Sequence, residues 1–493
     1  MIKLSLFFTL YSKFKQMKKV LYILAVTCIV LLTSCNQFLT ENLQDAYSSE
    51  NFYTNQTNAV MGVTGVYNSL YGNILWVFGD IASDDAMKGG NAGDQTDITS
   101  LNNFSANSGN GEISTFWQST YETIDRANNV IANITAMSTT TIDPTIQKRL
   151  VGECKYLRAL SYFYLVNIFG EVPLKLEPQT TSASINVGLS SVSAIYTQIE
   201  KDLTDAVAVL PSSYTGSDLG RVTQGAVYGL LAKTCLYQQD YTGCITNITA
   251  LENLHQYNLV RNYADLFKPG AEDSVEVIFG LRFVNNTTVA LGDFLTQWFA
   301  PSLEGGYYFD APTQNYVNAF TEQTTNGAVD PRLDASIGRD GQPWFNNTTF
   351  SSSWSPATGY LVKKYDENLT TGVPIGHSTV PYHYMRYADI LLMKAEALNE
   401  TGDIVDAAVA VNRVRARALL APTTAASQAT LRSVIQNERR KELGFEFHRF
   451  FDLMRWGQAT AEAALGSNFK WTSPRFYFPI PQAELDANQA LSK

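Results

Sequence analysis

Aromatic and short polar side chains are concentrated in two stretches of this sequence that lack a helical period. Residues 253–383 are rich in Gly, Asn, Thr and Pro, and residues 71–112 contain the Gly-rich run 88–94. A flat ring covers the C–H face of a sugar at little entropic cost, while carboxylate and amide groups bond the hydroxyls on its rim. These two stretches therefore favour non-covalent binding of a carbohydrate.

We select ten residues as candidate ligand contacts, because each has a suitable side chain on a predicted loop. A ring under a long loop can equally belong to the core, so we expect only some of the rings, and at least two, to contact a ligand. The candidates are Trp298, Tyr307, Tyr308, Trp344 and Trp354 in the later stretch, and Trp76, Asp84, Asp85, Asn102 and Asn103 in the earlier one.

No arrangement of catalytic residues is recognisable in the sequence. A glycosidase needs two carboxylates roughly 5–10 Å apart across a cleft, and the adjacent pairs Asp84–Asp85 and Glu272–Asp273 do not suit that geometry. The chain has no G-x-S-x-G motif, no phosphate-binding loop and no metal-binding histidine spacing. We therefore expect no catalytic residue, no metal and no cofactor, and predict that the protein is not an enzyme.

Helical periodicity dominates the remaining sequence, which must position these loops. Two segments, 232–241 and 395–404, each end one helix, turn, and begin another at matching spacing. This is the pattern of a tetratricopeptide-type helical hairpin. We predict a mainly α fold of tetratricopeptide-like helical hairpins with an inserted loop-rich ligand-binding region. The expected helices are 56–70, 113–137, 146–169, 192–210, 223–238, 387–401, 404–419 and 429–447.

The N-terminus has the features of a secretory leader for a lipoprotein. The basic start at Met17 precedes an apolar run, 20–32, which is shorter than the roughly 20 residues of a membrane-spanning helix. Leu32 to Ser34 then leads into Cys35 in the manner of a bacterial lipobox, so we expect a signal peptide over 1–34 and lipidation of Cys35. Whether translation starts at Met1 or Met17 stays open.

Net charge and cysteine content argue against a nucleic-acid-binding protein and against a domain held together by a disulfide framework. The chain carries 36 Lys and Arg against 46 Asp and Glu, and an acidic surface repels phosphate backbones, so we expect no nucleic-acid partner. Beyond Cys35 there are only Cys154, Cys235 and Cys244, too few for a disulfide framework. Cys154 and Cys235 lie in apolar helical stretches and are expected to be buried. A bridge between Cys235 and Cys244 remains an alternative.

Several local patterns, taken in order along the chain, resemble the SusD/RagB family of Bacteroidetes outer-membrane lipoproteins. The lipobox is the first of them, and the resemblance extends over the whole chain after Cys35. The other matching segments are 156–165 with 169–174, 386–397, 412–418, 438–446, 449–457, and Pro479 to Pro481 with Glu484.

The resemblance implies a fold, a partner and a location. It implies a single SusD-like domain over 35–493, with helical scaffold at about 36–70, 113–252 and 384–493 and loop-rich binding regions at about 71–112 and 253–383. It implies a SusC-like TonB-dependent transporter as partner, an oligosaccharide as ligand, and a lipid-anchored, surface-exposed location on the outer membrane. The ligand residues of this family lie on variable loops, so our ten candidates rest on chemistry and position alone.

Two alternatives and one structural interpretation accompany this prediction. The chain could be a peptide-capturing member of the same family, or a helical-repeat scaffold that binds only proteins. Seven charged residues on apolar helices are expected to form buried ion pairs between hairpins and not to contact a ligand. They are Arg158, Arg386, Asp389, Glu396, Arg439, Glu442 and Arg455.

Overall fold

A computed structural model describes residues 17–18, 52–71, 74–286, 291–367, 376–472 and 474–491. The predicted lipidation site Cys35 and nearly all of the predicted leader lie outside the described residues. Residues 55–493 form one compact unit, to which the following description applies. No helix among the described residues is long and apolar enough to cross a bilayer.

Long helices make up most of this unit, and every helix expected from the periodicity is present within a few residues of its predicted bounds. They are α3 (Gln56–Asn68), α5 (Gly111–Ala136), α6 (Pro144–Phe169), α8 (Val192–Val207), α9 (Gln224–Tyr237), α10 (Tyr241–Glu252), α14 (Tyr387–Glu400), α15 (Ile404–Arg417) and α16 (Gln428–Leu443).

Capping residues fix the ends of these helices. Asn110 accepts a hydrogen bond from the Ile113 amide at the start of α5, and Asp143 does the same for α6, where Pro144 occupies the first turn. The chain leaves α6 at Gly170, whose φ of 74° lies in the left-handed region that glycine tolerates. Local sequence therefore sets where the two longest helices begin and where α6 ends.

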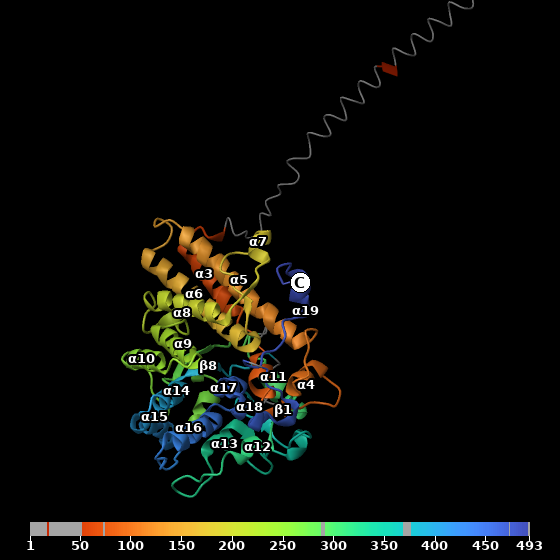
Figure 1. Cartoon of the computed structure of the whole chain (residues 1–493), viewed down its shortest axis with the longest axis vertical. Coiled ribbons are helices and arrows are strands. Elements are labelled where there is room, and N and C mark those ends of the chain that lie inside the picture. Colours follow the sequence, from red (N-terminus) through yellow and green to blue (C-terminus); the bar gives the residue numbers. More distant parts are fainter. Residues whose placement is uncertain are drawn as a thin grey trace, which may run out of the picture. The chain divides into compact units, whose positions relative to one another are not determined.

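The long helices pack in succession, so that each buries a face against the next. Helix α3 contacts α5 and α6, and the series continues through α8, α9 and α10 to α14, which contacts both α15 and α16 (Figure 1). The hairpin segments 232–241 and 395–404 are thereby neighbours, because α10 packs against α14. This arrangement confirms the predicted mainly α, tetratricopeptide-like fold.

Short elements occupy the two predicted loop-rich stretches, the C-terminal end and two connections between long helices. The short helices are α4 (Thr96–Asn102), α7 (Ser182–Ile185), α11 (Leu295–Phe299), α12 (Gln314–Asn318), α13 (Pro331–Ser336), α17 (Arg449–Trp456), α18 (Gln458–Leu465) and α19 (Gln482–Ala487), with one π-helical turn at η1 (Val77–Ile81). The 3-10 turns are η2 (Gly216–Asp218), η3 (Tyr263–Phe267), η4 (Ala271–Asp273), η5 (Ser302–Glu304), η6 (Ser352–Trp354) and η8 (Gly466–Asn468).

Among the described residues, four two-stranded antiparallel sheets join separate segments of the chain. The strands are β1 (Ala86–Lys88), β2 (Val172–Pro173), β3 (Leu189–Ser190), β4 (Val277–Leu281), β5 (Asp310–Pro312), β6 (Ile337–Gly338), β7 (Leu361–Val362) and β8 (Tyr382–Arg386), paired β1–β5, β2–β3, β4–β8 and β6–β7. Pairing of Lys88 with Asp310 in β1–β5 links the two loop-rich stretches. The residues that could bind a ligand are thus brought together by backbone hydrogen bonds.

Ion pairs within the interior hold the helices together, as predicted for the seven charged residues. Arg158 of α6 binds Asp202 of α8, and Arg439 of α16 binds Asp389 of α14. Arg455 forms ion pairs with Glu396 and with Asp452. Arg386 pairs with Glu442, which is also buried.

All three described cysteines, Cys154, Cys235 and Cys244, are free and buried. The alternative of a Cys235–Cys244 bridge is therefore wrong for this structure. Burial in apolar helical surroundings raises the pKa of each thiol, so none is activated as a thiolate.

Candidate functional site

The candidate site is a set of partly exposed rings that we call the aromatic face, formed by Trp298, Tyr307, Tyr308, Phe345 and Trp354. All five lie in the stretch 253–383. Tyr307 has the largest exposure, at 45% of its surface. The other four are partly buried, and each keeps some surface in contact with solvent.

Helix α11 positions the first ring. The Asp293 carboxylate accepts a hydrogen bond from the Leu295 amide (2.8 Å) and so anchors the start of the helix. The Trp298 ring lies 6.1 Å from Trp76 and 5.7 Å from Phe309 between ring centroids. Its inner side is therefore packed, and only its outer part is available to a ligand.

The segment after α11 folds back on that helix and presents Tyr307. The Tyr307 amide donates to the Gln297 carbonyl (2.9 Å), and the Phe309 amide donates to the Trp298 carbonyl (2.8 Å). The Tyr307 ring stacks on Phe309 at 5.3 Å with an interplanar angle of 25°, and it lies 5.6 Å from Trp298 at 55°. Tyr307 and Trp298 thus form two inclined surfaces of one aromatic wall.

Tyr308 sends its ring in a different direction because its backbone is left-handed, with φ of 43°. That conformation is costly for a bulky residue and persists only where the surroundings fix it. Here the Gly90 amide donates to the Tyr308 carbonyl (3.0 Å), and the Tyr308 hydroxyl donates to Asn91 (3.0 Å). A Cβ atom at Gly89 would overlap the Tyr308 carbonyl oxygen, which explains the glycine there.

The remaining rings form a second cluster that Tyr308 contacts. Trp344, Phe350 and Leu361 are its buried centre, and Tyr308, Phe345 and Trp354 pack around it. The Trp344 indole N–H donates to Glu304 (2.9 Å), which lies in the same segment as Tyr307. Lys363 places its ammonium 5.3 Å from the Phe345 ring. Consecutive residues Tyr307 and Tyr308 therefore connect two aromatic clusters into one face.

Five of the ten candidate residues have structural contacts or are buried, which corrects their selection as exposed ligand contacts. Trp76 and Trp344 are only 1% and 5% exposed, so they support the face from beneath and offer no free ring surface. Asp84 and Asp85 bind Arg449 and Arg440, and the structure uses them to tie the loop to α16 and α17. Asn102 donates to the Ile81 carbonyl (2.8 Å) and also has a structural role.

The other five candidates are accessible, and their role in binding stays a prediction. Trp298, Tyr307, Tyr308 and Trp354 belong to the aromatic face. Asn103 is exposed at the C-terminal end of α4. Sequence reasoning did not select Phe345 or Asn91, because neither residue type nor spacing distinguishes them from other loop residues.

Buried carboxyl groups lie directly behind the face. Asp310 follows Phe309 and is fully buried, and burial raises its pKa to about 8. Burial raises the pKa of Asp80 as well, and the nearby charges of Asp310 and Asp85 raise it further. Burial also raises the pKa of Asp293 to about 8. Burial is the largest cause for each of these groups, and it holds the pKa of each carboxyl above its ordinary value.

The buried carboxyls predict a stability that falls as the pH rises. A carboxyl whose pKa is raised by folding stabilises the folded state below its unfolded pKa, and that contribution is lost as the pH approaches the folded pKa. For Asp310 and Asp293 this interval runs from about 4 to about 8. Carboxylates with lowered pKa, such as Glu446 and Asp452 at about 2, lose their contribution only below that interval.

The buried His383 and His448 have pKa values lowered to about 4 and about 3, so they add stability as the pH rises to their unfolded value and oppose the carboxyls below about pH 6.5. We therefore expect the free energy of unfolding, measured by urea denaturation, to decrease by roughly 1 kcal/mol per pH unit between pH 6.5 and pH 8. The substitution Asp310→Asn keeps the shape of the carboxyl but cannot ionise, so it should reduce this slope. An unchanged slope in Asp310→Asn would show that Asp310 is not a titrating group.

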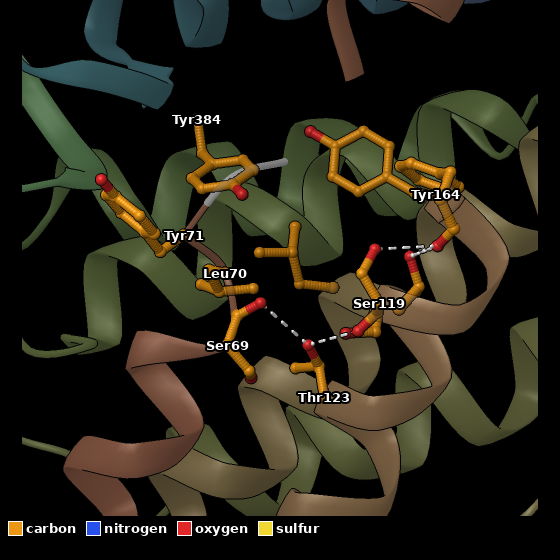
Figure 2. A pocket seen from close by; sticks show the side chains of 11 residues that line it. Ser69, Leu70, Tyr71, Ser119, Thr123, Tyr164 and Tyr384 are labelled. Carbon is orange, nitrogen blue, oxygen red and sulfur yellow. Dashed lines mark hydrogen bonds between the residues drawn. The ribbon is translucent and has the colours of Figure 1, made fainter. Parts of the chain in front are cut away.

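Of the hollows near the core, the one shown in Figure 2 is too small for a sugar. Its volume is about 20 Å³, which is room for about one water molecule. Figure 2 shows the rings of Tyr164 and Tyr384 on one side and the side chains of Ser119 and Thr123 on the other. Thr123 donates to the Ser119 carbonyl (3.1 Å), so this hollow is part of the helix packing.

No set of three His, Cys, Asp or Glu side chains within the described ranges is placed to hold a metal ion. Near the aromatic face, Asp84 and Asp85 pair with arginine, and Asp310 is buried with a raised pKa. What the face offers is ring surface with neighbouring hydroxyl and amide groups, which is the chemistry of reversible sugar binding.

Two family models match consecutive parts of the chain. The model described as "Starch-binding associating with outer membrane" matches residues 12–236, and the model described as "SusD family" matches residues 275–493. Among known proteins, a SusD-like protein of Formosa agariphila is 26% identical over 93% of this chain and 95% of its own length. The starch-binding protein SusD of Bacteroides thetaiotaomicron is 25% identical over 71% of this chain and 72% of its own.

Solved structures agree with these sequence matches. A SusD superfamily protein from Bacteroides vulgatus superposes with a TM-score of 0.79 at 25% identity, covering 89% of this chain and 98% of its own. A laminarin-binding SusD-like protein superposes with a TM-score of 0.77 at 28% identity and the same coverage. Sequence and fold therefore point to one group of proteins.

Proposed function

The chain belongs to the SusD family, and we propose that it is a surface lipoprotein that binds an oligosaccharide and delivers it to a SusC-like TonB-dependent transporter in the outer membrane. The observation that carries the proposal is the aromatic face, in which Tyr307 and Trp298 present inclined rings beside polar loop residues. Rings in this arrangement can cover successive sugar units of a glycan.

The nature of the relatives supports a neutral glycan as ligand. One similar protein is named for starch binding and one similar structure for laminarin binding. Starch and laminarin are both neutral glucans, and within the described part of the chain the aromatic face has no cluster of free cations that would select a polyanion. Starch and laminarin are therefore the first ligands to test.

We propose further that the protein is not an enzyme. Two acidic residues beside the rings are Asp310, which is fully buried, and Glu304, which accepts a hydrogen bond from Trp344. Neither presents a carboxylate to a glycosidic bond on the aromatic face. Incubation of the purified chain with starch and laminarin should yield no shorter products.

Membrane attachment through lipidated Cys35 is also part of the proposal. A diacylated cysteine anchors a protein stably, because each buried methylene contributes about 0.8 kcal/mol. The lipobox sequence and the match to a family model described as associating with the outer membrane support this attachment.

The alternative of peptide capture by a member of this family uses the same face, because aromatic rings also bind apolar side chains. A scaffold that binds only proteins fits less well, since a scaffold has no need of exposed loop rings. A peptide-binding protein would be retarded in neither a starch nor a laminarin gel.

The substitution Tyr307→Ala tests the function directly. We expect about a tenfold loss of affinity for the bound glycan, since a ring–sugar contact of this kind is worth about 1.4 kcal/mol. Isothermal titration calorimetry with soluble starch fragments and with laminarin measures the affinity, and affinity electrophoresis provides a second measurement.

Tyr241→Ala is the matched control, because Tyr241 is a half-exposed tyrosine at the start of α10, on the helical scaffold. The Tyr241→Ala variant should bind the glycan with the same affinity as the unmodified chain. Equal affinity of Tyr307→Ala and the unmodified chain for a glycan that binds would contradict the placement of the site.

A further inference from the structure

The turn formed by residues 91–94 lies against Tyr308 of the aromatic face and carries one exposed amide, that of Asn91. The Asp94 backbone amide donates to the Asn91 carbonyl (3.3 Å) and closes the turn. The third residue of the turn is Gly93, whose φ of 86° lies in the left-handed region that glycine tolerates. Local sequence therefore fixes the backbone that carries Asn91.

Two side chains hold the main chain of Asn91 in place. The Asn91 backbone amide donates to the Asp94 carboxylate (3.0 Å), and the Asn91 carbonyl accepts from the Lys88 ammonium (3.1 Å). Lys88 and Asp94 also form an ion pair, in which the Lys88 side chain is only 7% exposed. Because Lys88 belongs to β1, which pairs with β5, the same contacts fix Asn91 relative to the rings that precede β5.

The side-chain amide of Asn91 is oriented by the aromatic face. The Tyr308 hydroxyl donates to Asn91 Oδ1 (3.0 Å), and Oδ1 keeps a second lone pair. Asn91 is exposed, and its Nδ2 donates to none of the described residues. The amide therefore presents a free donor and a free acceptor on neighbouring atoms, to solvent and beside the Tyr308 ring.

Two hydroxyls on neighbouring ring carbons of a sugar match such an amide. One hydroxyl accepts from Nδ2 while the other donates to Oδ1, so both polar atoms of the side chain are satisfied. The inner units of starch chains keep such a pair of hydroxyls free. In laminarin the glycosidic linkage occupies the ring carbon between the two that carry free hydroxyls, so its inner units lack the pair. The amide therefore distinguishes two glucans that ring stacking alone does not.

We propose that Asn91 is a specificity-determining residue of the aromatic face, which selects glycans whose inner units carry free hydroxyls on neighbouring carbons. This proposal rests on the glycan binding proposed above and narrows the class of ligand. The Tyr308 ring covers the C–H face of one sugar unit, and Asn91 bonds two hydroxyls on its rim. The amide loses little side-chain entropy on binding, because Tyr308 already orients it.

Isothermal titration calorimetry of the full chain with maltohexaose and with laminarihexaose tests the proposal. The unmodified chain should bind maltohexaose about tenfold more tightly, the effect of two hydrogen bonds of ordinary net strength. Asn91→Ala keeps the main-chain contacts of the turn, and it should weaken maltohexaose binding about tenfold while laminarihexaose binding stays unchanged. Tyr308→Phe keeps the ring but no longer orients the amide, so it should reduce the preference for maltohexaose in part.

Asn253→Ala is the matched control, because Asn253 is an exposed asparagine at the C-terminal end of α10 on the helical scaffold, and both affinities should stay unchanged. Tyr307→Ala removes a ring, so it should weaken both hexaoses by the same factor. The proposal is overturned if the unmodified chain binds the two hexaoses equally or prefers laminarihexaose, or if Asn91→Ala weakens both to the same extent. Binding of neither hexaose by the unmodified chain would contradict the proposed glucan binding itself, which separates the two failures.

Discussion

Replacing Arg386 with methionine is expected to lower the free energy of unfolding by about 3–5 kcal/mol, the cost of breaking a buried ion pair on one side. Arg386 is 1% exposed and its guanidinium donates to Glu446 (2.6 Å) and Glu276 (2.8 Å), and to the Glu442 backbone carbonyl (2.6 Å). Without it, three buried carboxylates would share fewer cations. Since domains are stable by only about 5–15 kcal/mol, this is a large fraction of the total.

Urea denaturation at pH 7 provides the measurement, and Arg126→Met provides the control. Arg126 pairs with Glu122 on the surface of α5, where both side chains are more than 40% exposed. Exposed pairs contribute only about 0–1 kcal/mol. Equal effects of the two substitutions would show that the network around Arg386 does not stabilise the fold.

The substitution Gly89→Ala should remove glycan binding while the helical scaffold stays folded. The added methyl group would overlap the Tyr308 carbonyl oxygen, so the Tyr307–Phe309 segment must move away from β1. Because Tyr307, Phe309 and Trp298 depend on that segment for their positions, we expect a loss of affinity of about tenfold or more. Isothermal titration gives the affinity, and far-ultraviolet circular dichroism reports the helices.

Gly188→Ala is the matched control for this substitution. Gly188 is exposed, and a Cβ atom there meets no other atom within 4 Å. The Gly188→Ala variant should bind the glycan with unchanged affinity. Retained binding in Gly89→Ala, with an intact circular dichroism spectrum, would contradict the role that we assign to the close approach at Gly89.

The helical scaffold could be predicted because its signals are local. Apolar residues recur at the helical period, and residues such as Asn110 and Asp143 mark the helix starts. The charged positions on apolar helices also indicated ion pairing, because an unpaired charge is rarely buried. Their individual partners could not be predicted, since Arg386 meets Glu276 and Glu446 from segments 110 and 60 residues away.

The candidate site was predictable in composition but not in detail. Trp76 and Trp298 are the same residue type in similar loop contexts, yet one is buried beneath the other. Asp84 and Asp85 meet Arg449 and Arg440 across more than 350 residues of chain, and no local pattern records that contact. Which ring faces solvent depends on pairing between β1 and β5, which is non-local.

The left-handed backbone of Tyr308 has a consequence for how a ligand is captured. Hydrogen bonds from Gly90 and to Asn91, together with the packing of its ring, hold this residue in place, so the protein's own contacts fix the aromatic face. For the glycan binding that we propose, association then requires little ordering of the loop, so the entropic penalty of binding is small. Encounter need not wait for a conformational rearrangement, which favours fast capture of a dilute ligand.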